Sequence, residues 1–203
     1  MIAFNEIWDL TLEHVSMVLI SVGIAGAIGV ALGVALTRRS GLRRWVLGFA
    51  GLMQTVPSLA LFGFLIPIPL IGGIGRRTAI LALVLYALLP VLRNTLAGIL
   101  GVDQAVRESA VAMGMTARQI LWEVELPLAS RTILAGIRVA TVTTIGTATI
   151  AAYIGGGGLG VLIARGLASV DSAQILAGAI PAACIALLAE GGLGWVERKL
   201  SPV

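Results

Sequence analysis

The feature that most constrains this chain is a run of uncharged, mostly apolar residues from 15 to 37. As a helix of about 1.5 Å per residue, this run is about 34 Å long, enough to cross the roughly 30 Å hydrocarbon core of a bilayer. Only 12% of the 203 residues are charged and 58% are hydrophobic, whereas soluble domains are about 25% charged. We therefore predict an all-α, polytopic membrane protein, folded as one domain over residues 1–203. About five transmembrane helices are expected, at residues 15–37, 45–66, 78–100, 133–152 and 172–195.

The basic residues outside these apolar segments predict how the chain crosses the membrane. Nine of them fall in segments that share one side, and three fall on the other side. The positive-inside rule makes the first side cytoplasmic, so the N-terminus is expected outside and the C-terminus in the cytoplasm. The nine are Arg38, Arg39, Arg43, Arg44, Arg107, Arg118, Arg131, Arg198 and Lys199, and the three are Arg76, Arg77 and Arg165.

Residues 1–14 contain three acidic residues and no lysine or arginine. A signal peptide needs a basic first region, so we expect a short acidic arm that leads into an uncleaved helix. His14 is the only histidine, and we expect it in solvent or at the membrane interface, not on a metal.

The longest polar interval, residues 102–127, begins with a short predicted helix. It runs from Asp103 to Met113 and places Val106, Ala110 and Met113 on one face. Gly114 follows where a helix commonly ends in a left-handed residue, a conformation that costs glycine almost nothing.

A second short helix is predicted directly after this glycine. Thr116 and Gln119 have the spacing of a capping box, in which each side chain satisfies a free backbone N–H. Pro127 disfavours helix at the residue before it, so this helix is expected to stop near Leu126. A compact helix–glycine–helix with apolar ridges is typical of a docking element.

Helix–turn–helix elements also bind DNA. Between residues 103 and 131, however, three arginines face four acidic residues, so the attraction to phosphate that DNA binding needs is absent. An ordered loop without any partner stays open as an alternative.

Glu108, Ser109, Ala110, Gly114 and the segment 124–127 stand at the spacing of a known motif. They resemble the cytoplasmic EAA coupling loop of permeases in binding-protein-dependent ABC importers, with Ser109 for the first alanine and Val124 for the usual isoleucine. The resemblance implies a type I importer fold, like that of methionine permeases, and coupling of this loop to an ATPase. The residues assigned to coupling are Glu108, Ser109, Ala110, Gly114, Ile120, Leu121, Val124, Leu126 and Pro127.

The chain has no G-x-x-x-x-G-K-[ST] loop to bind ATP, no catalytic serine–histidine–acid set and no metal-ligand spacing. We therefore expect a transport subunit and not an enzyme, with ATP and Mg²⁺ bound by a partner. The resemblance implies a bacterial cytoplasmic membrane complex with two ATPases, a second permease of the same or a paralogous chain, and an extracytoplasmic binding protein. Closure of the ATPases would rock the helices from inward- to outward-facing. Ala25, Gly29 and Gly33 form a small-residue stripe that we expect to face another helix closely, and two-fold assembly would bury such faces against the second permease.

Two segments, QTVPSLAL from Gln54 and YALLPVLRNT from Tyr86, also resemble the osmoprotectant permeases. From them we assign Gln54, Pro57, Ser58 and Tyr86 to the translocation path. A proline in a membrane helix frees a carbonyl that a neighbour, water or a passing solute must satisfy; the alternative for Pro57 is a packing kink. Arg93 is either a headgroup anchor or a gate residue.

Thr143 and Thr147 share one helix face and are candidates for the same path, unless their hydroxyls bond back to their own helix. The glycines that follow cannot hold a helix against their backbone entropy, so we predict a flexible external corner there. We assign it to an external gate, and residues 161–170 predict a short helix along the membrane. The corner residues are Gly155, Gly156, Gly157, Gly158 and Leu159.

The resemblance implies osmoprotectants such as glycine betaine, carnitine and choline as the solutes. Proteins hold quaternary ammonium ions over aromatic faces, and aromatics are only 5% of this chain, so we expect that cage on the binding protein. An amino-acid or methionine-type importer shares the loop and glycine motifs and stays open. An ion-coupled carrier would need acidic residues in mid-membrane, where only Glu190 comes close, and a simple anchor would not need the hinge at Gly114.

Overall fold

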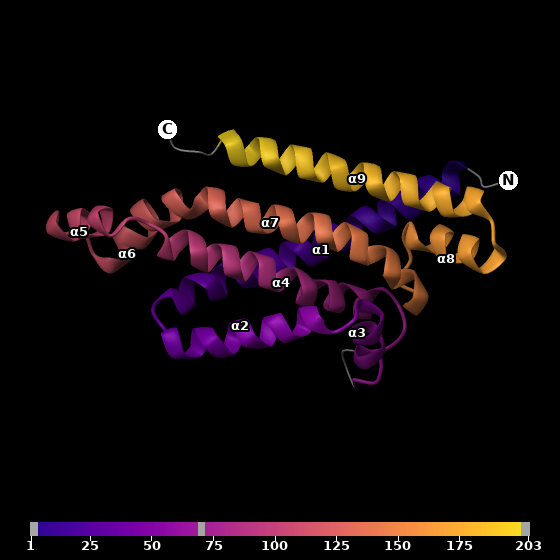
Figure 1. The fold of residues 1–203 in the computed structure, drawn as a ribbon, viewed down its shortest axis with the longest axis horizontal. Coiled ribbons are helices and arrows are strands. Elements are labelled where there is room, and N and C mark those ends of the chain that lie inside the picture. The colour runs from indigo at the N-terminus through magenta and orange to yellow at the C-terminus, as the bar shows by residue number, and fades with distance from the viewer. Residues whose placement is uncertain (1–3, 69–71, 200–203) are drawn as a thin grey trace.

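The computed structural model describes residues 4–68 and 72–199, and every regular element in these two ranges is a helix (Figure 1). Apolar stretches and their caps set where the helices lie, and glycine or proline lies at most of the breaks. In chain order the elements are α1 (Phe4–Thr37), α2 (Ser40–Thr55), α3 (Ser58–Leu65), α4 (Arg76–Leu100), α5 (Gln104–Ala112), α6 (Ala117–Gln119), π-helical η1 (Ile120–Glu125), α7 (Leu126–Ala148), 3-10 helical η2 (Thr149–Ile154), α8 (Gly160–Ser169) and α9 (Ser172–Lys199).

The predicted all-α membrane architecture is confirmed. Within the described ranges, α1, α4, the continuous segment Ala117–Ile154 and α9 are each long and apolar enough to cross a bilayer. A fifth crossing is made if α2 and α3 together form one span, although they are bent by 106° at Pro57. The interruption at Pro57 is therefore a sharp turn between two helices.

Three helices, α1, α4 and α7, pack together at the centre, with α2 against α4 and α9 against α7 (Figure 1). The short helices α5 and α6 lie at one end of this bundle. The N-terminal end of α1 and α8 lie at the other end, whereas α9 runs back toward the end that carries α5 and α6. The two termini of the described chain therefore lie toward opposite ends of the bundle.

The small-residue stripe of α1 faces α4 of the same chain. A Cβ added at Gly29 would lie 2.8 Å from Cγ1 of Val91, and one at Gly33 would lie 2.5 Å from Cγ2 of Thr95. The close approach predicted from the stripe is confirmed. The expected partner was wrong, because α4 already fills the face that we expected a second permease to cover.

The acidic arm and the position of His14 differ from the prediction. Helix α1 begins at Phe4, so the acidic residues belong to the helix itself. His14 is fully buried, with Nε2 3.1 Å from the carbonyl oxygen of Ile145 on α7. The acidic residues are held in the helix because other segments supply them with polar partners: Glu6 pairs with Arg165 of α8, and Glu13 accepts from the backbone N–H of Gly158.

The helix that we expected to stop near Leu126 continues into the membrane. Residues Ile120–Glu125 form a π-helical stretch, and the N–H of Leu126 donates to the carbonyl of Leu121, five residues earlier. Pro127 then stands in the first turn of α7. Proline lacks an N–H and its ring clashes with the preceding turn of a regular helix, and the wider π turn relieves this conflict. The predicted fourth span, residues 133–152, is therefore the C-terminal part of a longer helical segment, Ala117–Ile154.

Candidate functional site

The coupling loop has the local geometry that its sequence predicts. The carboxylate of Asp103 accepts from the N–H of Ala105 and caps α5. Gly114 ends this helix with a φ of +79°, and the N–H of Met115 then donates to the carbonyl of Ala110 at 3.1 Å. Thr116 and Gln119 form the expected capping box at the start of α6.

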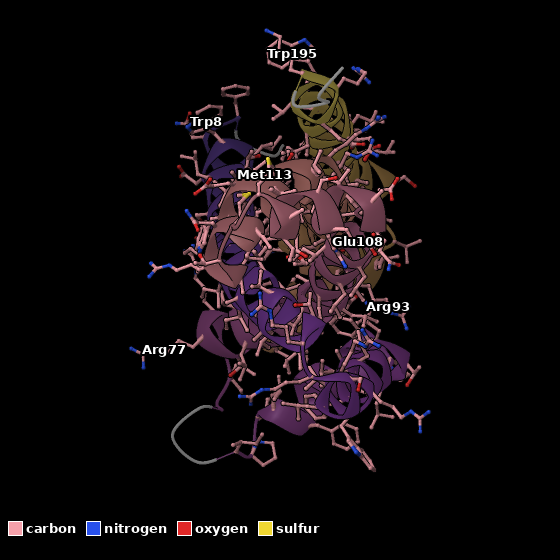
Figure 2. The ribbon with its side chains drawn as sticks, turned by 90° about the vertical axis from the view of Figure 1, so that its left-hand side faces the viewer. Trp8, Arg77, Arg93, Glu108, Met113 and Trp195 are labelled. Atoms are coloured by element: carbon pink, nitrogen blue, oxygen red, sulfur yellow. The ribbon has the colours of Figure 1, made fainter. Side chains whose placement is uncertain are left out.

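The loop presents an exposed tip and a half-buried base. Figure 2 looks onto this end of the bundle, and Glu108 and Met113 lie there on the side toward the viewer. Ala110 is buried, whereas the side chain of Met113 is 74% exposed. Of the face predicted for α5, only Ala110 therefore points inward. Half-buried residues of the base are Ile120, Leu121, Val124 and Leu126, and exposed residues of the loop are Val106, Glu108, Ser109, Val111, Trp122 and Pro127.

Three of the residues assigned to the path come together where α2 breaks into α3. The hydroxyl of Tyr86 on α4 donates to the carbonyl of Val56, which loses its helical partner at the break before Pro57. The side-chain amide of Gln54 in turn donates to the carbonyl of Tyr86 at 2.8 Å. Pro90 has no N–H for that carbonyl, four residues earlier in α4. Each helix thus satisfies a carbonyl that a proline or a break has freed in the other.

The other assigned path residues are not part of this pair of hydrogen bonds. Ser58 is half-buried and starts α3. Thr143 and Thr147 lie on α7, where their hydroxyls donate to the carbonyls of Val139 and Thr143 at 2.8 and 2.9 Å. These bonds are the back-bonding alternative for the threonines. Arg93 is exposed on α4 (Figure 2), with its guanidinium beside Gly51 of α2.

The glycine corner is closely packed, so the flexible corner predicted from the sequence is wrong. Gly155, Gly157 and Gly158 have positive φ angles of 71°, 80° and 78°, a conformation that favours glycine. The N–H of Gly158 donates to Oε2 of Glu13 on α1 at 3.0 Å. Leu159 is fully buried, and a Cβ on Gly156 would lie 3.0 Å from Cβ of Ala79 on α4. The corner therefore contacts both α1 and α4.

Residues 25–202 match the family described as the binding-protein-dependent transport system inner membrane component. The chain belongs to this family. The match covers four of the apolar helical segments and the whole coupling loop, so the loop belongs to an ABC importer permease and is not a DNA-binding element.

Relatives of known function cover nearly the whole chain. It is 48% identical to the carnitine transport permease protein OpuCD of Listeria monocytogenes, over 98% of this chain and 86% of the relative. It is 45% identical to the glycine betaine/carnitine/choline transport system permease protein OpuCD of Bacillus subtilis, over 94% and 82%. The osmoprotectant import permease protein OsmW of Salmonella typhimurium is 43% identical, over 96% of this chain and 90% of the relative.

The fold is that of a type I importer permease. A chain of the MetNI methionine ABC transporter in an inward-facing conformation superposes with a TM-score of 0.87, over 99% of this chain and 100% of that chain. Sequence identity to it is 22%. The predicted methionine-permease-like fold is therefore confirmed, and this likeness concerns the fold alone.

An ion-pair network between α7 and α9 was not predicted from the sequence. Arg138 pairs with Glu190 at 2.8 Å and with Glu197 at 3.2 Å, and Arg131 lies 3.7 Å from Glu197. The signal was present, because both arginines and both glutamates are spaced seven residues apart, which places each pair on one helix face. Glu190, the acid that an ion-coupled carrier would have needed, is paired here.

Proposed function

We propose that this chain is the membrane-spanning permease of an ATP-driven importer of osmoprotectants, namely quaternary ammonium compounds such as carnitine, glycine betaine and choline. The observation that carries the proposal is the 43–48% identity to permeases of these solutes over almost the whole chain. The coupling loop supports it, because Glu108 is exposed on α5, and Ala110 and Gly114 form the left-handed turn that such a permease would offer to its ATPase.

The proposed complex contains two copies of a cytoplasmic ATPase, which bind ATP and Mg²⁺, a second permease and an extracytoplasmic binding protein. The exposed apolar tip of the coupling loop would lie in a groove of the ATPase, where contact would remove it from water. The membrane is the bacterial cytoplasmic membrane. The N-terminal end of α1 and the glycine corner would then face outward, and the C-terminus and the coupling loop would face the cytoplasm.

The proposed translocation path includes Gln54, Pro57 and Tyr86, which lie together at the break between α2 and α3. Ser58, Thr143 and Thr147 are further residues of that path. The glycine corner, Gly155–Gly158 with Leu159, is the proposed external gate. Closure of the two ATPases on ATP would draw two coupling loops together and open that gate.

The first experiment is purification of the tagged chain from native membranes in a mild detergent, with identification of its partners and an ATPase assay. We expect an ATPase to copurify and its activity to rise when a binding protein loaded with glycine betaine, carnitine or choline is added. A chain that purifies without ATPase activity would contradict the proposal.

Ion-coupled transport predicts a different result for Glu190. In our proposal the Glu190→Gln variant weakens the contact between α7 and α9, but uptake still depends on ATP and not on a proton or sodium gradient. Uptake into vesicles with an imposed gradient and no ATP would support the carrier alternative. An Asp9→Asn variant, which removes an exposed acid of α1 outside the coupling loop, is the control.

A further inference from the structure

Arg107 on α5 contacts the end of α4 and the last residue of η1, which continues directly into α7. Its Nη2 donates to the carbonyl of Ile99 in the last turn of α4. Its Nε lies 3.0 Å from Oε1 of Glu125, the residue that directly precedes α7. The side chains of Arg107 and Glu125 are only 30% and 13% exposed, so solvent and salt screen this pair less than an open surface pair.

The chemistry of this contact favours an arginine. The Ile99 carbonyl is one of the last four of α4, which carry the negative end of the helix dipole, and it accepts from the guanidinium in addition to the N–H of Val102 at 3.3 Å. The planar guanidinium donates to the Ile99 carbonyl through Nη2 and forms an ion pair with Glu125, although Nε makes no hydrogen bond of its own; a lysine ammonium would act as a single point charge in place of this extended group. Directly below, Ile99 packs with Ala129 and Ile133 of α7.

Apart from Arg107, α5 is attached through its two ends and through the buried Ala110. One end joins α4 through the turn at Gly101 and Val102, and the other joins α6 through Gly114. Glycine turns are the most flexible connections in a chain. Arg107 lies between these turns and ties α5 directly to α4 and to the start of α7.

We propose that Arg107, with Glu125, is the positioning residue that makes α4, α5 and α7 move as one unit. This inference rests on the proposed function. A displacement of α5 by the ATPase then reaches two membrane helices at once, whereas an untied α5 moves within its own turns while ATP is consumed.

The test measures uptake of labelled glycine betaine, carnitine and choline per ATP hydrolysed, with the complete transporter in proteoliposomes. Arg107→Gln should lower this ratio about tenfold, because a charge-assisted contact between partly buried groups is lost. Arg107→Lys should recover only part of it. The control is Arg44→Gln, which removes an exposed charge of α2 and should leave the ratio unchanged. A wild-type ratio in Arg107→Gln, or an equal loss in Arg44→Gln, would overturn the proposal.

Glu125→Gln provides a second route, including the case where Arg107→Gln does not assemble. It should lower the ratio, and the double variant should be no worse than Arg107→Gln alone, because residues that act as one unit are not additive. Additive losses would show that the two residues act separately and would contradict the proposed joint role of Arg107 and Glu125.

Backbone hydrogen exchange over residues 103–127 separates this inference from the proposed function. In the assembled complex, Arg107→Gln should raise amide exchange in α5 and η1 about tenfold over wild type, since the loop opens locally once its tie is lost. Unchanged amide exchange would refute the proposed role of Arg107, whichever solute the transporter carries. A wild-type complex that takes up none of the three solutes would instead refute the proposed function, while the exchange result still decides the role of Arg107.

Discussion

Substitution of Gly114 should uncouple ATP hydrolysis from uptake through backbone strain alone. Its φ is +79°, and a Cβ added at this position would have no neighbouring atom within 4 Å. The cost of a side chain is therefore conformational: about 1–2 kcal/mol for alanine in the left-handed region, and more for a β-branched valine. A difference of 1–2 kcal/mol changes the population of the native turn by a factor of roughly 5–30.

A series of variants separates this strain from a steric contact with the ATPase. Asparagine is larger than alanine but tolerates the left-handed conformation. If strain decides, uptake per ATP should fall in the order Gly114, Gly114→Asn, Gly114→Ala, Gly114→Val. If contact with the partner decides, alanine should be tolerated better than asparagine.

The assay is uptake per ATP hydrolysed in proteoliposomes, after the amount of inserted and assembled chain has been matched by quantitative immunoblot. Strain predicts that Gly114→Val inserts normally and hydrolyses ATP but moves little solute. The reasoning is refuted if Gly114→Val keeps the wild-type ratio, or if Gly114→Asn is worse than Gly114→Ala.

Two further substitutions test the packing of the bundle through thermal unfolding in detergent. Tyr86→Phe leaves the carbonyl of Val56 without its donor, which should destabilise the chain by about 1–3 kcal/mol; a variant as stable as wild type would show that water replaces the hydroxyl. Gly33→Val forces a branched side chain against Thr95, 2.5 Å from where the Cβ would lie, and should cost about 1–3 kcal/mol or more through overpacking. Gly23→Val, at a position with no atom within 4 Å of the Cβ, should be tolerated, and equal losses at the two glycines would contradict the close contact.

Local chemistry explains which features could be predicted from the sequence. The capping box at Thr116 and Gln119 and the left-handed turn at Gly114 depend on neighbouring residues, and both are present as expected. The apolar lengths likewise predicted the membrane helices, because a bilayer fixes the length of apolar chain that it needs.

Contacts between distant segments explain what the sequence did not predict. The burial of His14 requires the carbonyl of Ile145, 131 residues away. The stripe on α1 identified a close helix approach but could not identify α4 as the neighbour. Pro127 predicts a helix end by its local preference, and this preference is overridden by the π turn before it, which no periodicity in the sequence indicates.

The continuous helix also connects the two functional regions that were predicted separately. The segment Ala117–Ile154 contains 38 residues in unbroken helical conformation, about 57 Å if each residue rises about 1.5 Å. It begins at the capping box of the coupling loop and ends at the glycine corner, where the N–H of Gly75 donates to the carbonyl of Ile154 at 2.7 Å. Because helical hydrogen bonds resist extension, a shift at the end that carries the coupling loop would be carried to the corner within one element. An isolated stop at Leu126 would have required that shift to pass through a turn.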